Sequence, residues 1–390
     1  MKTAKHLLLS LLPTFAFLVL PLLMMSTLSR SALAVEAKDI KANTDKRVLM
    51  VLSSYGKEQG KTQPGYEFDE FSKAYLVFKA NGVTVDLASP QGGAIEADKY
   101  DPNKAFNAAV LQDSMIMEKL ANTLKIADVS AKEYQGVFVV GGKGAMFDLP
   151  KDASLQQAIA DIYQQNGSVA AVCHGPAALV DVKLADGSYL IANKAVNGFT
   201  NAEEKLFGKK WINQFEFMLE DKLIERGAKF QSSPIMLSHV AVDSRLITGQ
   251  NPSSTVAVAT ELVKSMGIEP VPFNDYEDDR TLAMVARILE GDDKALTTLM
   301  TKQSDYHIEL VGMYGYYYLQ TAQNDAALEK SLTLMTLAQE AINNPRLDLT
   351  IAKTQHKLGD DKAAIATLNQ LLASKPDFEP AQEMLKSLSL

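Results

Sequence analysis

The chain has 390 residues, of which 47% are hydrophobic and 22% charged, and a formal net charge of -8. This length and balance predict more than one domain and at least one sizeable core. The net negative charge, without any block rich in Lys and Arg, argues against nucleic acid as a partner, because affinity for phosphate backbones comes from clustered cations.

The N-terminus has the pattern of an export signal. Two lysines precede an apolar stretch from Leu7 to Met25, and the small-residue motif "SALA" ends at Ala34. This pattern predicts a signal peptide over residues 1–34, with export to a periplasm or secretion after cleavage. The alternative is an uncleaved membrane anchor, although Pro13 and Pro21 would kink such a helix.

Beyond a predicted linker at 35–46, short apolar runs alternate with helical stretches. The predicted strands are residues 47–54, 83–89, 136–142 and 168–173, and the predicted helices are 71–82, 115–126 and 156–167. This alternation predicts an α/β domain over residues 47–268, with a doubly wound, mostly parallel sheet and helices on both faces. Ligands bind beyond the carboxyl ends of such strands, where "SSYG", "GGKG" and the sequence around Cys173 all fall.

Cys173 is the only cysteine, so it cannot form a disulfide within its own chain. It is either a buried, inert thiol or a residue with a chemical role. The preceding "SVAAVC" is typical of a buried strand, and "GPAALVDV" from Gly175 predicts a helix with Pro176 in its first turn. A strand, a tight turn and a helix form a nucleophile elbow, and a helix N-terminus favours the thiolate. The flanking sequence therefore favours a catalytic cysteine.

Four segments carry a resemblance to a known family. The sequences "VFVVGGKGAMFDL", "AAVCHGPAAL", "NGFTNAEE" and "LITGQNPSS" resemble, in this order, motifs of the ThiJ/PfpI superfamily. Within it they are similar to the branch of heat-shock chaperones and glutathione-independent glyoxalases (glyoxalase III), often labelled type 1 glutamine amidotransferase-like. The resemblance runs from Arg47 to Gly267 and implies a flavodoxin-like fold with a nucleophile elbow.

The resemblance implies roles for residues near Cys173. His174 matches the histidine that acts as base and proton carrier, and Glu204 matches the acid that orients it. An imidazole needs such a partner to hold its tautomer. Glu203, directly beside Glu204, is the rival for this role.

A second carboxylate is expected to face the thiol. Glu70 follows Gly65 by five residues, which resembles the family's pattern of "KTG" plus glutamate. Proton transfer by Glu70 near neutral pH requires a raised pKa. The alternative is a solvated helix face, since Glu67 and Asp69 lie close by in the sequence.

The "GGKG" segment follows a predicted strand and is the candidate oxyanion and substrate-binding site. Its backbone N–H groups, from Gly141, Gly142, Lys143 and Gly144, are expected near the thiol together with that of His174. Lys143 departs from the family, whose members commonly carry histidine there. The lysine either favours anionic ligands or points to solvent.

Other chemistries lack their motifs. True class I glutamine amidotransferases take their histidine from a distant H-x-E segment. The other histidine of this domain, His239, is followed by Val and Ala, which argues against that activity. His239 is expected to be a core histidine. No metal is predicted, because the five histidines and one cysteine show no ligand spacing. No cofactor is predicted either, since the sequence has neither a GxGxxG nor a GxxxxGK[ST] motif.

The last part of the chain is predicted to be helical, over residues 280–390 after a linker at 269–279. "GDDKAL" at Gly291 recurs as "GDDKAA" at Gly359, 68 residues later, and "NDAALEKSL" begins near the midpoint. A period of about 34 residues resembles tetratricopeptide repeats and accommodates about three helical hairpins. The tyrosine-rich "MYGYYYLQ" at 313–320 is either a peptide-binding groove or part of the core.

Two functions of different class follow. The first is a cysteine-dependent enzyme, a lyase or hydrolase acting on a small carbonyl compound. The resemblance points to a glutathione-independent glyoxalase that converts methylglyoxal to D-lactate, or to a related deglycase or amide hydrolase. The second is a chaperone or scaffold in which the sheet domain and the repeats bind protein partners. Relatives are commonly homodimers, so a homodimer is expected.

Overall fold

The computed structural model describes residues 44–273 and 275–388, so the predicted signal peptide lies outside the described residues. A seven-stranded sheet has the order β3-β2-β1-β4-β5-β9-β8. Its strands are β1 Arg47–Val51, β2 Thr84–Ser89, β3 Leu124–Lys125, β4 Gly136–Val139, β5 Ser168–Val172, β8 Val240–Asp243 and β9 Leu246–Gly249. All neighbouring strands are parallel except β8 and β9, which confirms the expected mostly parallel sheet.

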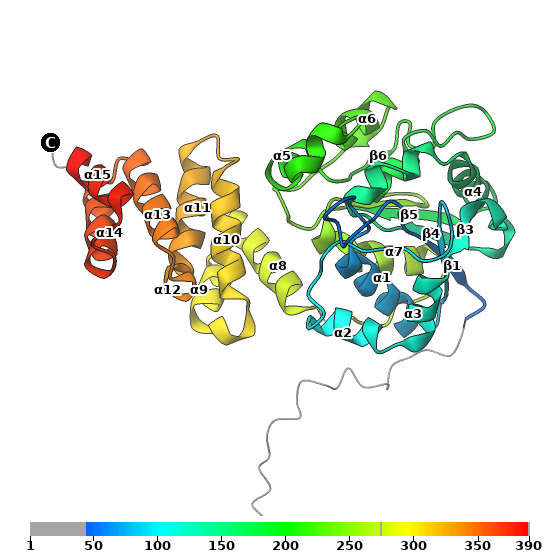
Figure 1. Ribbon diagram of the computed structural model, residues 1–390, viewed down its shortest axis with the longest axis horizontal. Coiled ribbons are helices and arrows are strands. Elements are labelled where there is room, and N and C mark those ends of the chain that lie inside the picture. The colour runs from blue at the N-terminus through cyan, green and yellow to red at the C-terminus, as the bar shows by residue number, and fades with distance from the viewer. Residues whose placement is uncertain (1–43, 274, 389–390) are drawn as a thin grey trace, which may run out of the picture. The chain divides into compact units, whose positions relative to one another are not determined.

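Helices cover both faces of this sheet (Figure 1). Helices α1 (Phe68–Ala80) and α7 (Thr255–Ser265) pack against each other on one face, and α4 (Ala153–Gln164) packs against β4 and β5 on the other. Right-handed crossovers require this arrangement, because the strand order runs outward in opposite directions from β1 and β4. The β1, β4 and β5 strands end side by side, with Val51 opposite Val139 and Val139 opposite Ala171.

Several local predictions were wrong in detail. The helix expected at 115–126 ends early, because α3 covers Ser114–Ala121 and residues 124–125 form the edge strand β3. The remaining short elements of this region are α2 Ala105–Leu111, β6 Ala195–Val196, α5 Asn201–Phe207, α6 Leu219–Glu225 and β7 Lys229–Phe230. Strands β6 and β7 form a separate parallel pair that the sequence pattern does not reveal.

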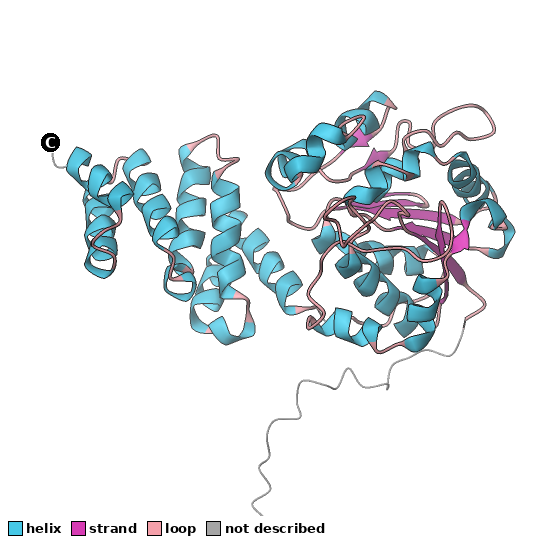
Figure 2. Ribbon diagram, viewed as in Figure 1, coloured by secondary structure: helices cyan, strands magenta, loops and turns pink. Residues whose placement is uncertain are grey.

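Beyond β9 the described chain contains only helices and turns (Figure 2). They are α8 Glu277–Leu289, α9 Asp293–Thr301, α10 Ile308–Leu319, α11 Asp325–Leu337, α12 Gln339–Ile342, α13 Pro345–Lys357, α14 Asp361–Ser374 and α15 Glu379–Leu388. We call residues 277–388 the helical region. Helix α8 begins three residues before the predicted boundary at 280, so Glu277, Asp278 and Asp279 belong to a helix and not to a linker.

The internal repeat marks equivalent helix ends. Gly291 and Gly359 both adopt the left-handed backbone that glycine tolerates, with φ of 91° and 83°. The aspartates that follow cap the next helices: Asp292 accepts hydrogen bonds from the N–H groups of two residues, and Asp360 accepts one from Ala363. Helices that follow one another pack together, among them α8–α9, α10–α11, α13–α14 and α14–α15. The assignment to tetratricopeptide repeats stays a prediction.

The sheet region and the helical region have largely separate apolar cores. One cluster fills the sheet region, and three further clusters lie mainly or wholly in the helical region. In the described residues, no helix has both the length and the apolar character to cross a membrane.

Candidate active site

Cys173 stands at the turn directly after the buried strand β5. Its φ of 60° is unusual for a residue with a side chain and costs on the order of 1–3 kcal/mol. Two backbone hydrogen bonds hold the turn: the Cys173 N–H donates to the Gly249 carbonyl at 2.9 Å, and the Phe199 N–H donates to the Cys173 carbonyl at 2.8 Å. The predicted nucleophile elbow is therefore present.

The helix after the elbow is not the α-helix that the sequence predicted. Residues Gly175–Leu179 form a 3-10 helix of five residues, not an α-helix. Gly175 lies so close to β4 that an added Cβ would meet the Val139 carbonyl oxygen at 2.5 Å. A 3-10 turn this short does not provide the helix dipole on which the predicted thiolate stabilisation depended.

His174 links the thiol to a carboxylate. Its Nδ1 lies 3.4 Å from the Cys173 Sγ, and its Nε2 lies 2.7 Å from an oxygen of Glu204. The three residues are 4%, 2% and 3% exposed, so the row of groups is shielded from water. With Nε2 protonated toward the carboxylate, Nδ1 is free to accept the thiol proton.

The structure distinguishes between the two adjacent glutamates. Helix α5 begins with a capping box in which Thr200 accepts a hydrogen bond from the Glu203 N–H, and Glu203 accepts one from the Thr200 N–H at 2.9 Å. The cap turns Glu203 away from His174, and Glu204 on the next position faces it. Glu204 is thus the histidine's partner, as expected.

Glu204 also depends on a nearby glycine. Its second carboxylate oxygen is buried and has no hydrogen-bond partner among the described residues. That oxygen lies directly against Gly208, where an added Cβ would collide with it. Gly208 has an ordinary helical backbone, so its role here is to leave room for the carboxylate.

Glu70 lies in the first turn of α1 and reaches the elbow from another part of the chain. Its carboxylate accepts a hydrogen bond from the Gly141 N–H at 2.8 Å, and the side chain is fully buried. An added Cβ at Gly141 would lie 2.7 Å from a Glu70 oxygen and 2.8 Å from the Cys173 Cβ. The glycine therefore allows the carboxyl group and the thiol to lie side by side, and the alternative of a solvated helix face is wrong.

The pKa values of Glu70 and Cys173 correct the expectation that Cys173 is a thiolate at rest. Burial, followed by the neighbouring charge of Glu67, raises the pKa of Glu70 well above its ordinary value. Burial and then Glu70 raise the pKa of the Cys173 thiol, so the predicted thiolate is not favoured at rest. Two buried acids side by side resist losing both protons, and the pair therefore holds a proton at neutral pH.

Only part of the "GGKG" backbone is available for an oxyanion. The Gly141 N–H binds Glu70, and the Gly144 N–H donates to the Gly65 carbonyl at 3.0 Å, so neither serves as expected. The Gly142 N–H approaches the Cys173 sulfur and lowers its pKa. The N–H groups of Gly142, Lys143 and His174 are the remaining candidates from this prediction.

Lys143 belongs to a charged group at the edge of the site. Its ammonium lowers the pKa values of Cys173, Glu67 and Asp98, which places it among these groups. Burial, together with the charges of two aspartates, raises the pKa of Glu67 to about 7. Glu67 also lines a cleft of about 490 Å³ with Asp69, Lys99, Tyr100, Asp101, Pro102 and Lys104.

Sequence patterns did not reveal the aromatic residues around His174. The ring of Phe199 lies 4.5 Å from the imidazole and that of Phe215 lies 6.1 Å away, both measured between centroids. Phe215 in turn contacts Phe147, which packs edge-on against Trp211. Phe199 stands within the quoted "NGFTNAEE" and Phe147 within "VFVVGGKGAMFDL", but Trp211 and Phe215 come from a segment that carried no signal.

Two further predictions concern histidine and metal. His239 is half-buried and its Nδ1 lies 2.9 Å from the Ser233 hydroxyl, so it is a structural histidine at the rim of the core. Across residues 44–273 and 275–388, no group of three or more His, Cys, Asp or Glu side chains is arranged to hold a metal ion.

Comparisons with known proteins agree with this geometry. The model of the DJ-1/PfpI family matches residues 61–265. A glutathione-independent glyoxalase of Schizosaccharomyces pombe (hsp3102) is 32% identical over 244 residues, which cover 57% of this chain and 98% of the relative. The glutathione-independent glyoxalase HSP31 of Saccharomyces cerevisiae is 32% identical over 237 residues, again 57% of this chain and 98% of the relative.

Solved structures show the same likeness. Glyoxalase III of Candida albicans superposes with a TM-score of 0.54 at 26% identity, over 58% of this chain and 99% of that one. The REP24 protein of Francisella tularensis has a TM-score of 0.53 at 34% identity, over 59% of this chain and 100% of that one. The family match ends at residue 265 and leaves the helical region outside it. On this evidence the chain belongs to the DJ-1/PfpI family.

Proposed function

We propose that the protein is a glutathione-independent glyoxalase that converts methylglyoxal to D-lactate with Cys173 as its nucleophile. The single observation that supports this most is the continuous contact from the thiol through His174 to Glu204, with the buried Glu70 beside the same thiol. The relatives named as glutathione-independent glyoxalases add support, since two of them match over almost their whole length.

The first step is addition of the thiol to the aldehyde carbon. His174 takes the thiol proton on Nδ1 as the carbon–sulfur bond forms, and Glu204 stabilises the resulting imidazolium. The N–H groups of Gly142 and His174 hold the developing oxyanion. The imidazolium then returns its proton to that oxygen, which gives a neutral hemithioacetal.

The second step isomerises the hemithioacetal without an external oxidant. His174 removes the proton from the former aldehyde carbon, while Glu70, protonated because its pKa is raised, donates its proton to the neighbouring carbonyl oxygen. The enediol is then reprotonated on the second carbon by His174, and its other hydroxyl proton returns to Glu70. A thioester with Cys173 results, and water releases lactate and the free thiol.

The test requires only the purified chain. With methylglyoxal and no added thiol, the wild-type protein should form D-lactate, and Cys173→Ala should reduce the rate to the buffer background. Met115→Leu, a conservative change at a residue 72% exposed on α3, serves as the control and should keep the activity. Equal rates of D-lactate formation by wild type and Cys173→Ala would contradict the proposal.

Related reactions use the same groups. A deglycase or amide hydrolase would also form a covalent intermediate at Cys173, and a parallel assay with a glycated amino acid and a simple amide separates these activities. A rate with either compound above that with methylglyoxal would assign the site to that reaction.

We also propose export of the chain after cleavage near Ala34, supported by the N-terminal sequence pattern. Mass spectrometry of the mature N-terminus in a Gram-negative host tests it, and an intact residue 1 in the membrane fraction would instead indicate an anchor. A homodimer fits the family and is testable by light scattering.

Partner binding by the helical region is a second proposal. Met313 and Tyr316 on α10 are 47% and 41% exposed, whereas Tyr314 is buried in the core. The tyrosine-rich segment is thus part core and part surface. If the surface side binds client proteins, the double change Met313→Ser and Tyr316→Ser should weaken suppression of client aggregation while leaving methylglyoxal turnover intact.

A further inference from the structure

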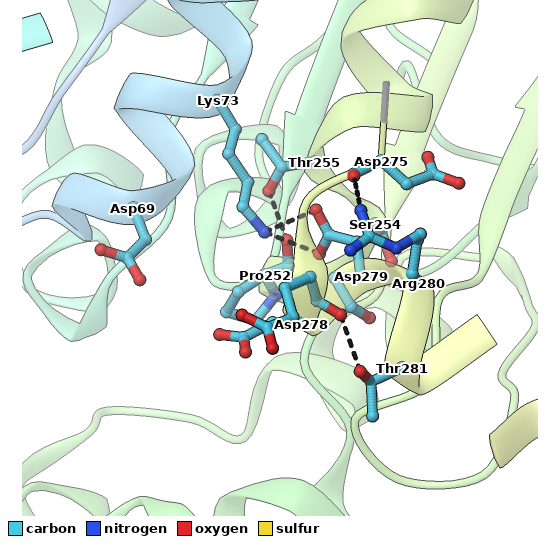
Figure 3. A network of polar contacts seen from close by, with 12 residues as sticks. Asp69, Lys73, Pro252, Ser254, Thr255, Asp275, Asp278, Asp279, Arg280 and Thr281 are labelled. Atoms are coloured by element: carbon cyan, nitrogen blue, oxygen red, sulfur yellow. Dashed lines mark hydrogen bonds and ion pairs between the residues drawn. The ribbon is translucent and has the colours of Figure 1, made fainter. Parts of the chain in front are cut away.

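The helical region is attached to the helix that carries Glu70. The Lys73 ammonium, one turn beyond Glu70 on α1, contacts both carboxylate oxygens of Asp279 on α8, at 2.6 and 2.8 Å (Figure 3). The two side chains are only 7% and 13% exposed. The rings of Phe106 and Tyr276 lie over the ammonium at 4.9 and 5.7 Å. This attachment is therefore a buried ion pair enclosed by aromatic rings.

A second attachment reaches the helix that carries Glu204. The ring of Phe207, the last residue of α5, packs edge-on against that of Tyr317 on α10, with centroids 4.8 Å apart. Phe207 is also the residue before Gly208, against which the Glu204 carboxylate lies. Movement of this end of α5 would therefore move the carboxylate that His174 contacts.

A third attachment runs through Glu203. Its Oε1 accepts hydrogen bonds from the Met236 N–H at 2.7 Å and from the Asn251 side-chain amide at 2.9 Å. The same amide donates to the Leu237 carbonyl at 2.8 Å. The Leu237 side chain is buried in an apolar cluster otherwise built from residues 284–338 of the helical region.

Tyr314 completes this third attachment from α10. It is 3% exposed, and its hydroxyl has no hydrogen-bond partner within the described chain. Burial first, and then the charges of Tyr318 and Glu203, raise its pKa, so Tyr314 lies near the glutamate adjacent to Glu204. Glu203 thereby joins the cap of α5 to the helical region on one side and to the loop at 236–237 on the other.

We propose that the helical region positions the catalytic acid: through Tyr317 against Phe207, and through Leu237 and Glu203, it holds α5 so that Glu204 stays on His174. Tyr317 is then a positioning residue, which acts through Glu204 and touches no substrate. The inference rests on the proposed function, in which Glu204 orients His174. It assigns a role in catalysis to a part of the chain that lies outside the family match.

The test uses the full-length chain and methylglyoxal turnover. Tyr317→Ala removes the ring that packs on Phe207 and should lower kcat about tenfold with KM little changed, because substrate contacts are not altered. Tyr317→Phe keeps the ring and should restore the wild-type kcat. Met300→Ala, a change at a residue of the helical region that is 60% exposed on α9, is the control and should leave both constants unchanged.

A double-mutant cycle separates positioning from a general loss of stability. In a Glu204→Asp background the carboxylate is already withdrawn from His174, so Tyr317→Ala should cause little further loss of kcat. An unchanged kcat in Tyr317→Ala, or a full tenfold loss in both backgrounds, overturns the inference. A wild-type protein that forms no lactate contradicts the proposed function instead, so the two failures are distinct.

Discussion

At the scale of single residues, the unusual feature is a thiol and a carboxyl group that lie side by side inside the protein, both with raised pKa values. Cys173 and Glu70 are both buried, and burial is the main cause of both raised pKa values. Glu70 raises the pKa of the thiol further, whereas the hydrogen bond with Cys173 lowers that of Glu70. Nucleophilic attack therefore depends on removal of the thiol proton by His174 during the reaction, and not on a thiolate at rest. The sequence pattern of a strand, a turn and a helix predicted the opposite, namely a thiolate stabilised by the N-terminus of that helix.

Replacement of the Glu70 carboxyl group should affect the reactivity of the Cys173 thiol and the turnover of methylglyoxal in opposite directions. In Glu70→Gln no carboxylate can form beside the thiol as the pH rises, so the pKa of Cys173 should be lower than in wild type and iodoacetamide alkylation should be faster at alkaline pH. Turnover should nevertheless fall by about 10²-fold or more, because a proton carrier is lost. Alkylation rates against pH, with kcat on the same preparations, check both effects.

Glu261→Gln is the control for that experiment, since Glu261 on α7 pairs with Lys264 at 2.6 Å outside the elbow. An alkylation profile that is identical in wild type and Glu70→Gln would show that the carboxyl group does not act on the thiol.

Glu67 should make stability depend on pH. Its pKa is about 7 in the folded chain against an ordinary 4.5, mainly because the half-buried side chain is desolvated. Between these values the folded chain binds a proton that the unfolded chain has lost, so the free energy of unfolding falls as pH rises through this window. Glu67→Gln should thus be more stable than wild type at pH 8, by about 2 kcal/mol after discounting for partial exposure.

Urea unfolding at pH 8 and pH 4.5 measures this effect. The two proteins should differ at pH 8 and have nearly equal stabilities at pH 4.5. A difference of the same size at both values would mean that the substitution acts through packing and not through titration.

At the scale of secondary-structure elements, the ends of helices explain why the sequence repeats. The recurring "GDD" places a glycine in the left-handed conformation and an aspartate at the next helix start, in α9 and again in α14. These are local requirements of the backbone, and so they are visible in the sequence. Helix α5 is defined in the same way by its capping box at Thr200.

Loss of one such cap has a measurable cost. Asp360→Ala removes the side chain that accepts the Ala363 N–H at the start of α14, and should lower the free energy of unfolding by about 1 kcal/mol. Asp377→Ala, at an exposed aspartate after the same helix, should change it by less than about 0.5 kcal/mol. Equal effects of the two substitutions in urea titrations would contradict the capping role.

Other elements were predictable only in part. The strands β1, β2, β4 and β5 fall within their predicted ranges, because buried parallel strands are continuous apolar runs. The stretch at 124–125 continues the helical pattern of α3, but pairing with β2 makes it an edge strand. The helix after Cys173 is a 3-10 turn, because Gly175 packs against the β4 backbone. Both differences arise from contacts with other strands.

At the scale of the whole described molecule, the buried pair of Lys73 and Asp279 joins segments 206 residues apart. Asp279→Asn would leave an ammonium group buried without its counter-ion, and should cost about 3–5 kcal/mol of unfolding free energy. The double change Lys73→Met and Asp279→Leu removes both charges and should recover most of this loss.

The exposed pair of Lys151 and Glu216 is the matched control, with side chains 53% and 63% exposed. Glu216→Gln should change the stability by no more than about 0.5 kcal/mol. If Asp279→Asn behaves like Glu216→Gln in chemical denaturation, the pair on α1 and α8 is not a structural link.

The sequence by itself determined the parts of this protein that depend on neighbouring residues. Strand patterns, the turn at Cys173, the cap before Glu204 and the repeated helix ends all follow from local backbone and side-chain requirements, and family motifs added His174, Glu70 and Glu204 as site residues. Tertiary structure alone decided which of two adjacent glutamates faces His174, and which "GGKG" amides are already bonded. It also decided that burial raises the thiol pKa, and that the helical region touches the supports of both carboxylates. These properties depend on distance and solvent exclusion between segments far apart in the chain, which no local pattern records.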